Sequence, residues 1–173
     1  MGTGWMSERQ RDGGIDRIPL PPDVPGELRL CGKRAIGGGR FEAPDMPWTT
    51  VVCLCQRHEL DTRYPAYVNW LDANPERSIW WPIHDLGAEP VEAMLPFIDD
   101  LVDRLRDGER LLVHCAAGLG RAGTTAVCLL VRLGVPLDEA TRTVADARPM
   151  AGPEAGSQRV LVHAVVRATS PTE

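Results

Sequence analysis

Apolar and polar positions along the chain alternate in blocks that predict strands and helices by turns. Residues 27–31 (ELRLC) alternate polar and apolar side chains, the pattern of a strand with one buried face. Three further segments are mostly apolar or β-branched along their length, which is typical of strands buried on both faces: 49–55, 78–81 and 111–113. Strands of this kind need helices on both sides of their sheet.

The segments between these strands predict helices. Residues 91–106 have the three-and-four spacing of an amphipathic helix, with apolar side chains at Leu95, Ile98, Leu101, Val102 and Leu105. Further helices are expected at 64–73, 121–133, 137–147 and 157–167, with Ser157 as the cap of the last. The alternation predicts an α/β fold with a central, mainly parallel sheet of about four or five strands flanked by helices.

Residues 1–26 differ from the rest of the chain, because they are polar and then rich in proline (IPLPPDVPG). Proline has no N–H to donate to a sheet, so we expect a flexible Pro-rich N-terminal arm here and a single domain over residues 27–173. No apolar run approaches the roughly 18 residues that cross a bilayer, and the first residues lack the apolar core of a secretory signal. We therefore expect a cytoplasmic protein without a membrane partner.

The charges and the cysteines argue against several classes of function. With 24 acidic and 19 basic residues the net charge is −5, which is unfavourable for nucleic-acid binding. The basic residues are arginines apart from Lys33, a composition typical of a GC-rich bacterial genome. The five cysteines are irregularly spaced and predict neither a disulfide framework nor a metal site, and Cys53 and Cys55 are expected to be buried thiols on one face of a strand. No cofactor is indicated, and the oligomeric state stays open.

The strongest chemical signal lies in residues 111–131 (LLVHCAAGLGRAGTTAVCLLV), where a buried strand enters a loop that opens an apolar helix. Backbone N–H groups at such a helix N-terminus form a concave site for a phosphate dianion, and Gly118 and Gly120 let the backbone fold tightly around it. The same positive field and the guanidinium of Arg121 favour the thiolate of Cys115, while the planar fork of Arg121 can hold two phosphate oxygens. The pattern predicts a phosphate-binding loop with a cysteine nucleophile. The alternative is a strand-turn-helix whose cysteine and arginine are structural.

Residues 114–123 (HCAAGLGRAG) resemble the signature of the protein tyrosine and dual-specificity phosphatases, in which the phosphate loop lies between a strand and a helix. The segment 53–64 (CLCQRHELDTRY) and the stretch up to Arg148-Pro149 are similar to the kinase-associated branch of the dual-specificity phosphatases, so that the resemblance covers residues 27–167. It implies a cysteine-dependent protein phosphatase with Cys115 as the nucleophile. The substrate-binding loop would then consist of Ala116, Ala117, Gly118, Leu119, Gly120 and Arg121.

Three further residues gain roles from this resemblance. The leaving oxygen needs a proton, and Pro82-Ile83-His84-Asp85 stands where the family has its general acid, which implies that role for Asp85; an Asp in a loop is otherwise a turn former or a solvated charge. His114 is expected to support the nucleophile through hydrogen bonds, with an ordinary core histidine as the alternative. Gln158 matches a glutamine that positions the hydrolytic water, although a polar residue in a first helical turn explains it equally well.

Ala122 departs from the family pattern, which has Ser or Thr directly after the loop arginine. That hydroxyl stabilises the cysteine thiolate as it leaves the phosphocysteine. Thr124 and Thr125 are near in sequence, but a helix points them elsewhere. We therefore expect slow breakdown of the intermediate and a less depressed pKa of Cys115.

Two classes of function follow from the sequence. The first is hydrolysis of phosphate monoesters on phosphoproteins without metal or cofactor, with phosphotyrosine and phosphoserine or phosphothreonine both open. A phosphoinositide headgroup is disfavoured, because the chain has a single lysine. The alternative is a phosphate-binding, pseudophosphatase-like module with little turnover, which Ala122 keeps open. An arsenate reductase or a sulfur transferase is weaker, since the first needs resolving thiols and the second leaves Asp85 without a role.

Overall fold

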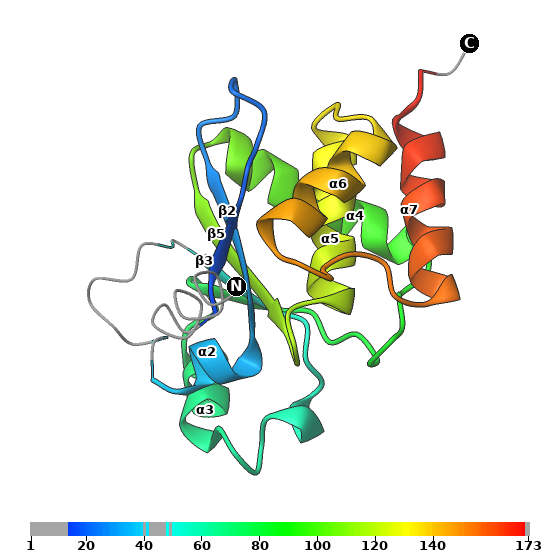
Figure 1. The fold of residues 1–173 in the computed structure, drawn as a ribbon. Coiled ribbons are helices and arrows are strands. Elements are labelled where there is room, and N and C mark those ends of the chain that lie inside the picture. Colours follow the sequence, from blue (N-terminus) through cyan, green and yellow to red (C-terminus); the bar gives the residue numbers. More distant parts are fainter. Residues whose placement is uncertain (1–13, 40, 42–47, 49, 172–173) are drawn as a thin grey trace, which may run out of the picture.

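A five-stranded sheet runs through the protein in the order β1-β2-β5-β3-β4 (Figure 1). The structure is a computed structural model that describes residues 14–39, 41, 48 and 50–171. The strands β2, β3, β4 and β5 are parallel to one another, and only the edge strand β1 is antiparallel to its neighbour. The predicted α/β fold with a mainly parallel sheet is therefore confirmed. The strands are β1 (Asp16–Ile18), β2 (Glu27–Gly32), β3 (Thr50–Cys53), β4 (Ser78–Trp80) and β5 (Arg110–Cys115).

Helices cover both faces of this sheet, as its doubly buried strands require. Along β5, Leu111 and Val113 belong to the core under the larger helical layer, whereas Leu112 belongs to the core on the opposite face. The larger layer contains α4 (Val91–Arg106), α5 (Gly120–Arg132), α6 (Leu137–Ala147) and α7 (Gly156–Thr169). The opposite face carries α2 (Lys33–Gly37), the 3-10 helix η2 (Arg57–Glu59) and α3 (Pro65–Ala73).

The N-terminal segment differs from its expectation in the part that the structure describes. Residues 14–26 were expected to belong to a flexible arm, yet β1 pairs with β2 and Ile18 is fully buried. The prolines do not prevent this, because Pro19 directly follows β1 and an edge strand needs only one paired side. The folded unit therefore begins before residue 27, and residues 1–13 lie outside the described part.

Helix α5 is the centre of the larger layer and positions the loop that precedes it. Its residues from Gly120 to Val131 are all buried, as the apolar sequence predicts, and it packs against α4, α6 and α7. The chain between α6 and α7 crosses α5 at Gly123, close enough that only hydrogen fits as a side chain there. Among the described residues, no helix combines the length and the apolar character needed to span a membrane.

This close crossing generates a test of the fold. In an open helix, Gly→Ala stabilises by about 1 kcal/mol. In Gly123→Ala the new methyl group would overlap the backbone nitrogen of Gly152 and lie 2.9 Å from the carbonyl carbon of Ala151. We expect the free energy of unfolding in urea to fall by about 2 kcal/mol, because overpacking outweighs the propensity gain.

Gly156→Ala is the matched control, because a methyl group at this first residue of α7 meets no atom within 4 Å. It should leave the free energy of unfolding unchanged or raise it. A Gly123→Ala protein at least as stable as the wild type would contradict the close crossing.

Candidate active site

The loop between β5 and α5 is shaped by residues on both sides of it. Strand β5 ends at Cys115 and α5 begins at Gly120, so residues 116–119 form the turn between them. Gly118 has φ +74, and a Cβ there would overlap the backbone of Cys31 and lie 2.8 Å from Arg148 Nη2. Only glycine combines that conformation with that space. The carbonyl of Ala116 accepts a hydrogen bond of 3.0 Å from the N–H of Lys33, which holds the loop against β2.

Cys115 lies at the base of this loop and is almost fully buried, at 2 % exposure. Burial raises the pKa of its thiol above the usual value, although the backbone N–H of Ala122, the guanidinium of Arg121 and the N–H of Gly118 all act to lower it. The groups that are expected to stabilise the thiolate are therefore present, but burial raises the pKa of Cys115 more than these groups lower it.

Arg121 is fixed from several sides in the buried centre of the site. Its guanidinium is 1 % exposed and forms a two-pronged ion pair with Glu59, with Nη1 and Nη2 donating over 2.8 and 2.7 Å. Nη1 also donates to the carbonyl of Ile83 over 2.8 Å. Glu59 binds the Nη1–Nη2 edge of the guanidinium. An arginine can also hold two oxygens through its Nε–Nη2 edge, which Glu59 does not use. Arg121 is therefore positioned before any anion arrives.

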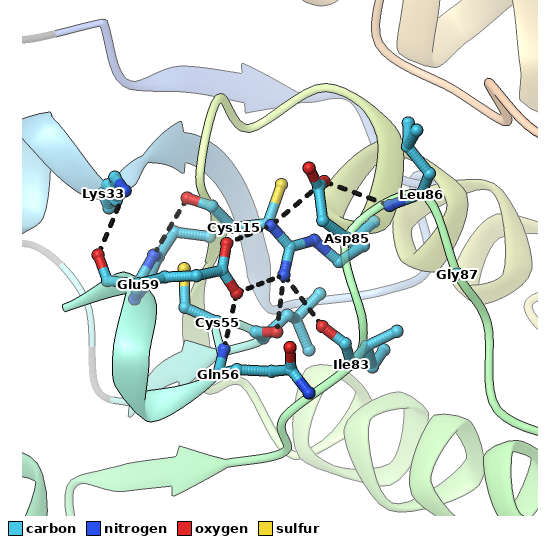
Figure 2. A network of polar contacts seen from close by, with 12 residues as sticks. Lys33, Cys55, Gln56, Glu59, Ile83, Asp85, Leu86, Gly87 and Cys115 are labelled. Atoms are coloured by element: carbon cyan, nitrogen blue, oxygen red, sulfur yellow. Dashed lines mark hydrogen bonds and ion pairs between the residues drawn. The ribbon is translucent and has the colours of Figure 1, made fainter.

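Glu59 is the functional residue of this site that the sequence did not reveal. It ends η2, just beyond β3, and its carboxylate also accepts the N–H of Gln56 over 2.7 Å (Figure 2). Burial alone would raise the pKa of Glu59, but the bonds from Arg121 and Gln56 bring it below its usual value. A signal did exist, because an acidic residue after the carboxyl end of a parallel strand lies where α/β sheets place their sites.

Asp85 stands at the mouth of the site on the loop that follows β4. Its side chain is 71 % exposed, and Oδ1 lies 3.4 Å from Arg121 Nη2. The same oxygen accepts the N–H of Leu86 over 3.0 Å, and Figure 2 shows the carboxylate turned toward Cys115. The structure thus brings together the three residues that the sequence singled out, Cys115, Arg121 and Asp85.

Gln158 ties the Asp85 loop to the start of α7. Its side chain is fully buried, with Oε1 accepting the N–H of Glu154 over 2.7 Å and Nε2 donating to the carbonyl of Gly87 over 3.3 Å. Ser157 is not the cap of α7, because Ala155 occupies that position; the Ser157 hydroxyl donates instead to the carbonyl of Leu86 over 3.3 Å. The polar groups of Gln158 are thus committed to the backbone in this structure.

The side chain of His114 lies on the face of the sheet that carries α3. It is fully buried, and its Nε2 shares a hydrogen bond of 2.6 Å with the hydroxyl of Tyr67. Its donor atom lies within 4.8 Å of the sulfurs of Cys53 and Cys55, which are themselves buried on that face as expected. The hydrogen bond with Cys53 and then burial raise the pKa of Cys55, so this thiol stays protonated.

This group does not fit a metal ion well. Zinc binds cysteine as the thiolate, and the raised pKa of Cys55 opposes loss of its proton. The nitrogen of His114 that faces Tyr67 is already hydrogen-bonded.

A second buried arginine, Arg148, holds the phosphate loop from outside, and sequence reasoning gave it no role. It donates to the carbonyls of Gly118 over 2.7 Å and Ala117 over 3.0 Å, and pairs with Asp16 over 2.6 Å. Since the carbonyls of Ala117 and Gly118 point toward Arg148, the loop's N–H groups are free to line its concave side. The pair with Asp16 also explains why β1 belongs to the folded unit.

At Ala122 the site lacks the hydroxyl that the family pattern has directly after the loop arginine. The side chain of Ala122 is fully buried, and only its backbone N–H reaches Cys115. Thr125 Oγ1 donates to the carbonyl of Arg121 over 2.9 Å, and Thr124 Oγ1 is buried with no hydrogen-bond partner among the described residues. The prediction that a helix points both threonines elsewhere is confirmed.

The sequence matches a family of phosphatase domains over most of its length. Residues 40–168 match the family model described as PTP-SAK, the Swiss Army Knife protein, DSP-PTPase phosphatase domain. The human protein "Dual specificity protein phosphatase 16" is 35% identical over 77 residues, which are 42% of this chain and 11% of that protein. The chain therefore spans only a small part of that relative.

Solved structures of this fold are similar over most of the chain. The kinase associated phosphatase, in a form with its catalytic cysteine replaced by serine, has a TM-score of 0.75 at 21% identity and covers 90% of this chain and 94% of its own. Tk-PTP in its active form has a TM-score of 0.64 at 24% identity, over 86% of this chain and 99% of its own. Human DUSP28 has a TM-score of 0.64 at 19% identity, over 88% of this chain and 94% of its own.

These structural likenesses establish the fold, and the family model establishes the family. The model covers the Asp85 loop, the phosphate loop and the start of α7 in one match. The resemblance to dual-specificity phosphatases seen in the sequence is thereby confirmed. The chain belongs to the PTP-SAK family of DSP-PTPase phosphatase domains.

Proposed function

We propose that this protein is a cysteine-dependent phosphatase that hydrolyses phosphate monoesters on cytoplasmic phosphoproteins through a phosphocysteine intermediate. The observation that carries the proposal is that Asp85, from the loop after β4, meets Cys115 and Arg121 of the phosphate loop, with Asp85 Oδ1 3.4 Å from Arg121 Nη2. A module that only binds phosphate has no use for a carboxylate at this point.

Substrate binding is the first step. The phosphate dianion enters the loop from Ala116 to Gly120, where backbone N–H groups surround it, and Arg121 holds two of its oxygens through the Nε–Nη2 edge. The dianion contacts the loop through backbone atoms, so the side chains of Ala116, Ala117 and Leu119 need not be polar. Arg121 can face it without rearrangement, because Glu59 and the carbonyl of Ile83 already fix the guanidinium.

Chemistry then proceeds in two displacements at phosphorus. In the first, the sulfur of Cys115 attacks, the bond to the leaving oxygen breaks, and Asp85 gives that oxygen its proton. In the second, water attacks the phosphocysteine, Asp85 accepts the proton of the water, and the sulfur leaves as thiolate with release of inorganic phosphate. Positioning of this water by Gln158 would require its Nε2 to exchange the carbonyl of Gly87 for the water.

A phosphate-binding module with little turnover is the second candidate, and two observations favour it. The pKa of Cys115 is raised by burial, which lowers the population of the nucleophilic thiolate, and Ala122 provides no hydroxyl to the departing sulfur. Such a protein would capture a phosphoprotein and release it unchanged. Turnover experiments separate the two candidates.

Hydrolysis of an aryl phosphate without metal ions is the direct test of catalysis. Cys115→Ser should abolish turnover, because serine is not deprotonated by the same surroundings. Arg121→Lys should lower kcat/KM by about 100-fold or more, since lysine cannot make the two-pronged contact.

Arg142→Lys on the exposed surface of α6 is the matched control and should retain full activity. An inactive wild type between pH 5 and 8 would refute the phosphatase proposal and favour the binding module.

Glu59→Gln tests the positioning of Arg121. The substitution keeps an oxygen acceptor but removes the charge that balances a guanidinium of 1 % exposure. We expect kcat/KM for the aryl phosphate to fall about tenfold and the free energy of unfolding to fall by about 3 kcal/mol, the effect of breaking a buried pair. Glu139→Gln, on the exposed side of α6, should change neither quantity. Unchanged activity in Glu59→Gln would show that Arg121 does not depend on this pair.

Ala122→Ser tests the missing hydroxyl through the pH dependence of Cys115. The raised pKa means that the thiolate fraction grows only as pH rises, so a new donor to the sulfur should lower the pKa and move the alkylation curve with iodoacetamide to lower pH. The slow phase after the burst with an aryl phosphate should also become faster. Ala126→Ser, one turn further along α5 and equally buried, is the control. If Ala122→Ser moves neither curve nor rate, the role assigned to the hydroxyl is wrong.

A further inference from the structure

Two residues beside the active site adopt a backbone conformation that their side chains disfavour. Leu86 has φ 59 and Met150 has φ 71, and they are the only non-glycine residues with positive φ in the described part of the chain. For residues other than Gly, Asn and Asp this conformation has an appreciable cost, and it persists where the surroundings impose it. Such outliers concentrate at active sites and ligand clamps.

The same two residues expose large apolar side chains to solvent. Leu86 is 56 % exposed and Met150 is 78 % exposed. Among the described residues only one other large hydrophobic residue, Val160 at 66 %, is comparably exposed, and it lies on regular helix α7. Leu86 and Met150 therefore combine two unfavourable features, strain and apolar exposure, which Val160 does not.

The loops that carry these residues are both bonded to the catalytic elements. Leu86 directly follows Asp85, its carbonyl accepts from Ser157, and Figure 2 shows its side chain projecting outward beside Asp85. Met150 lies in a turn closed by the bond from Ala151 N–H to the carbonyl of Arg148, over 2.9 Å.

That turn is fixed to the phosphate loop at both of its ends. Gly152 N–H donates to the carbonyl of Leu119 over 3.0 Å, and Arg148 donates to the carbonyl of Gly118. Figure 1 shows this segment, in orange between α6 and α7, passing across α5. The two apolar side chains are thus held by the segments that flank the phosphate loop.

The charges near the loop restrict which substrate fits beside these side chains. Asp85 is exposed at the mouth, and the carboxylate of Glu154 lies against Gly120. The one lysine, Lys33, donates to the carbonyl of Glu59 over 3.0 Å. Acidic groups next to the phosphate would be repelled by the carboxylate of Asp85, whereas apolar groups would not.

We propose that Leu86 and Met150 are specificity-determining contacts that bind apolar side chains flanking the phosphorylated residue of a protein substrate. The substrate class is accordingly a phosphorylated segment with apolar neighbours. The proposal rests on the phosphatase function proposed above. It explains why strained, solvent-exposed apolar residues stand at these two positions.

Matched phosphopeptides test the proposal directly. Two peptides differ only at the residues next to the phosphorylated one, which are Leu in the first and Ser in the second, each made in phosphotyrosine and phosphothreonine forms. We expect the wild type to favour the Leu peptide by about tenfold in kcat/KM, the scale of burying one large apolar side chain. In Leu86→Asn and in Met150→Asn this ratio should fall to about threefold. A general loss of activity cancels from the ratio within each variant.

Val160→Asn is the control and should keep the wild-type ratio, because it removes an equally exposed apolar side chain from regular helix.

Thermal unfolding gives a second readout. Asn tolerates positive φ, so Leu86→Asn and Met150→Asn should unfold at the wild-type temperature or about 2 °C above it. A fall in unfolding temperature would show that the two side chains are held for packing, and would overturn the proposal.

The outcomes for the two proposals are distinguishable. Hydrolysis of an aryl phosphate with a peptide ratio near one refutes the specificity contacts and leaves the phosphatase function intact. If aryl phosphate is not hydrolysed, the phosphatase function fails, and the same peptides are compared by their Kd in fluorescence anisotropy. An equal Kd for the Leu and Ser peptides then refutes the apolar contacts as well.

Discussion

The buried positive charge of Arg121 is the constraint on which the rest of the site depends. A guanidinium at 1 % exposure is tolerated only when its donors are satisfied and its charge is balanced. Glu59 balances the charge, and the carbonyl of Ile83 accepts a further donor. Each of these groups belongs to a different connection at the carboxyl edge of the sheet. Satisfying one arginine therefore ties the end of β3, the loop after β4 and the start of α5 into one unit.

The phosphate loop lies between two arginines that act on opposite faces of its backbone. Arg121 stands on the side where an anion would bind, whereas Arg148 binds the carbonyls of Ala117 and Gly118 from outside. A peptide group whose carbonyl is held outward presents its N–H inward, so Arg148 orients the loop without touching a ligand. Because Arg148 also pairs with Asp16, the edge strand β1 contributes to the shape of the site.

The groups around Cys115 act on its thiol in opposite directions. Burial raises the pKa of Cys115, while the N–H groups of the loop and Arg121 lower it. The charge of Arg121 is shared with Glu59, and Ala122 adds no hydroxyl, so desolvation prevails in this structure. The Asp85 loop is fixed differently, through Gln158 and Ser157 at the start of α7. Asp85 is thus positioned by the helical layer, and Cys115 by the sheet.

Local patterns in the sequence predicted most of the strands and helices in the described part of the chain, but not β1, α2 or η2. The helices at 91–106 and 137–147 have the predicted bounds, because apolar periodicity is a property of neighbouring residues. Cys115 and Arg121 were found together because one loop contains both, and Asp85 was found through family resemblance. The partner of Arg121 at Glu59, the grip of Arg148 and the place of β1 depend on contacts between residues far apart in the chain. The pKa of Cys115 depends on burial in the same way. By itself, the sequence predicted which residues form the phosphate loop, and only the tertiary structure decided how their charges are balanced, because long-range packing brings the counter-charges and carbonyls to them.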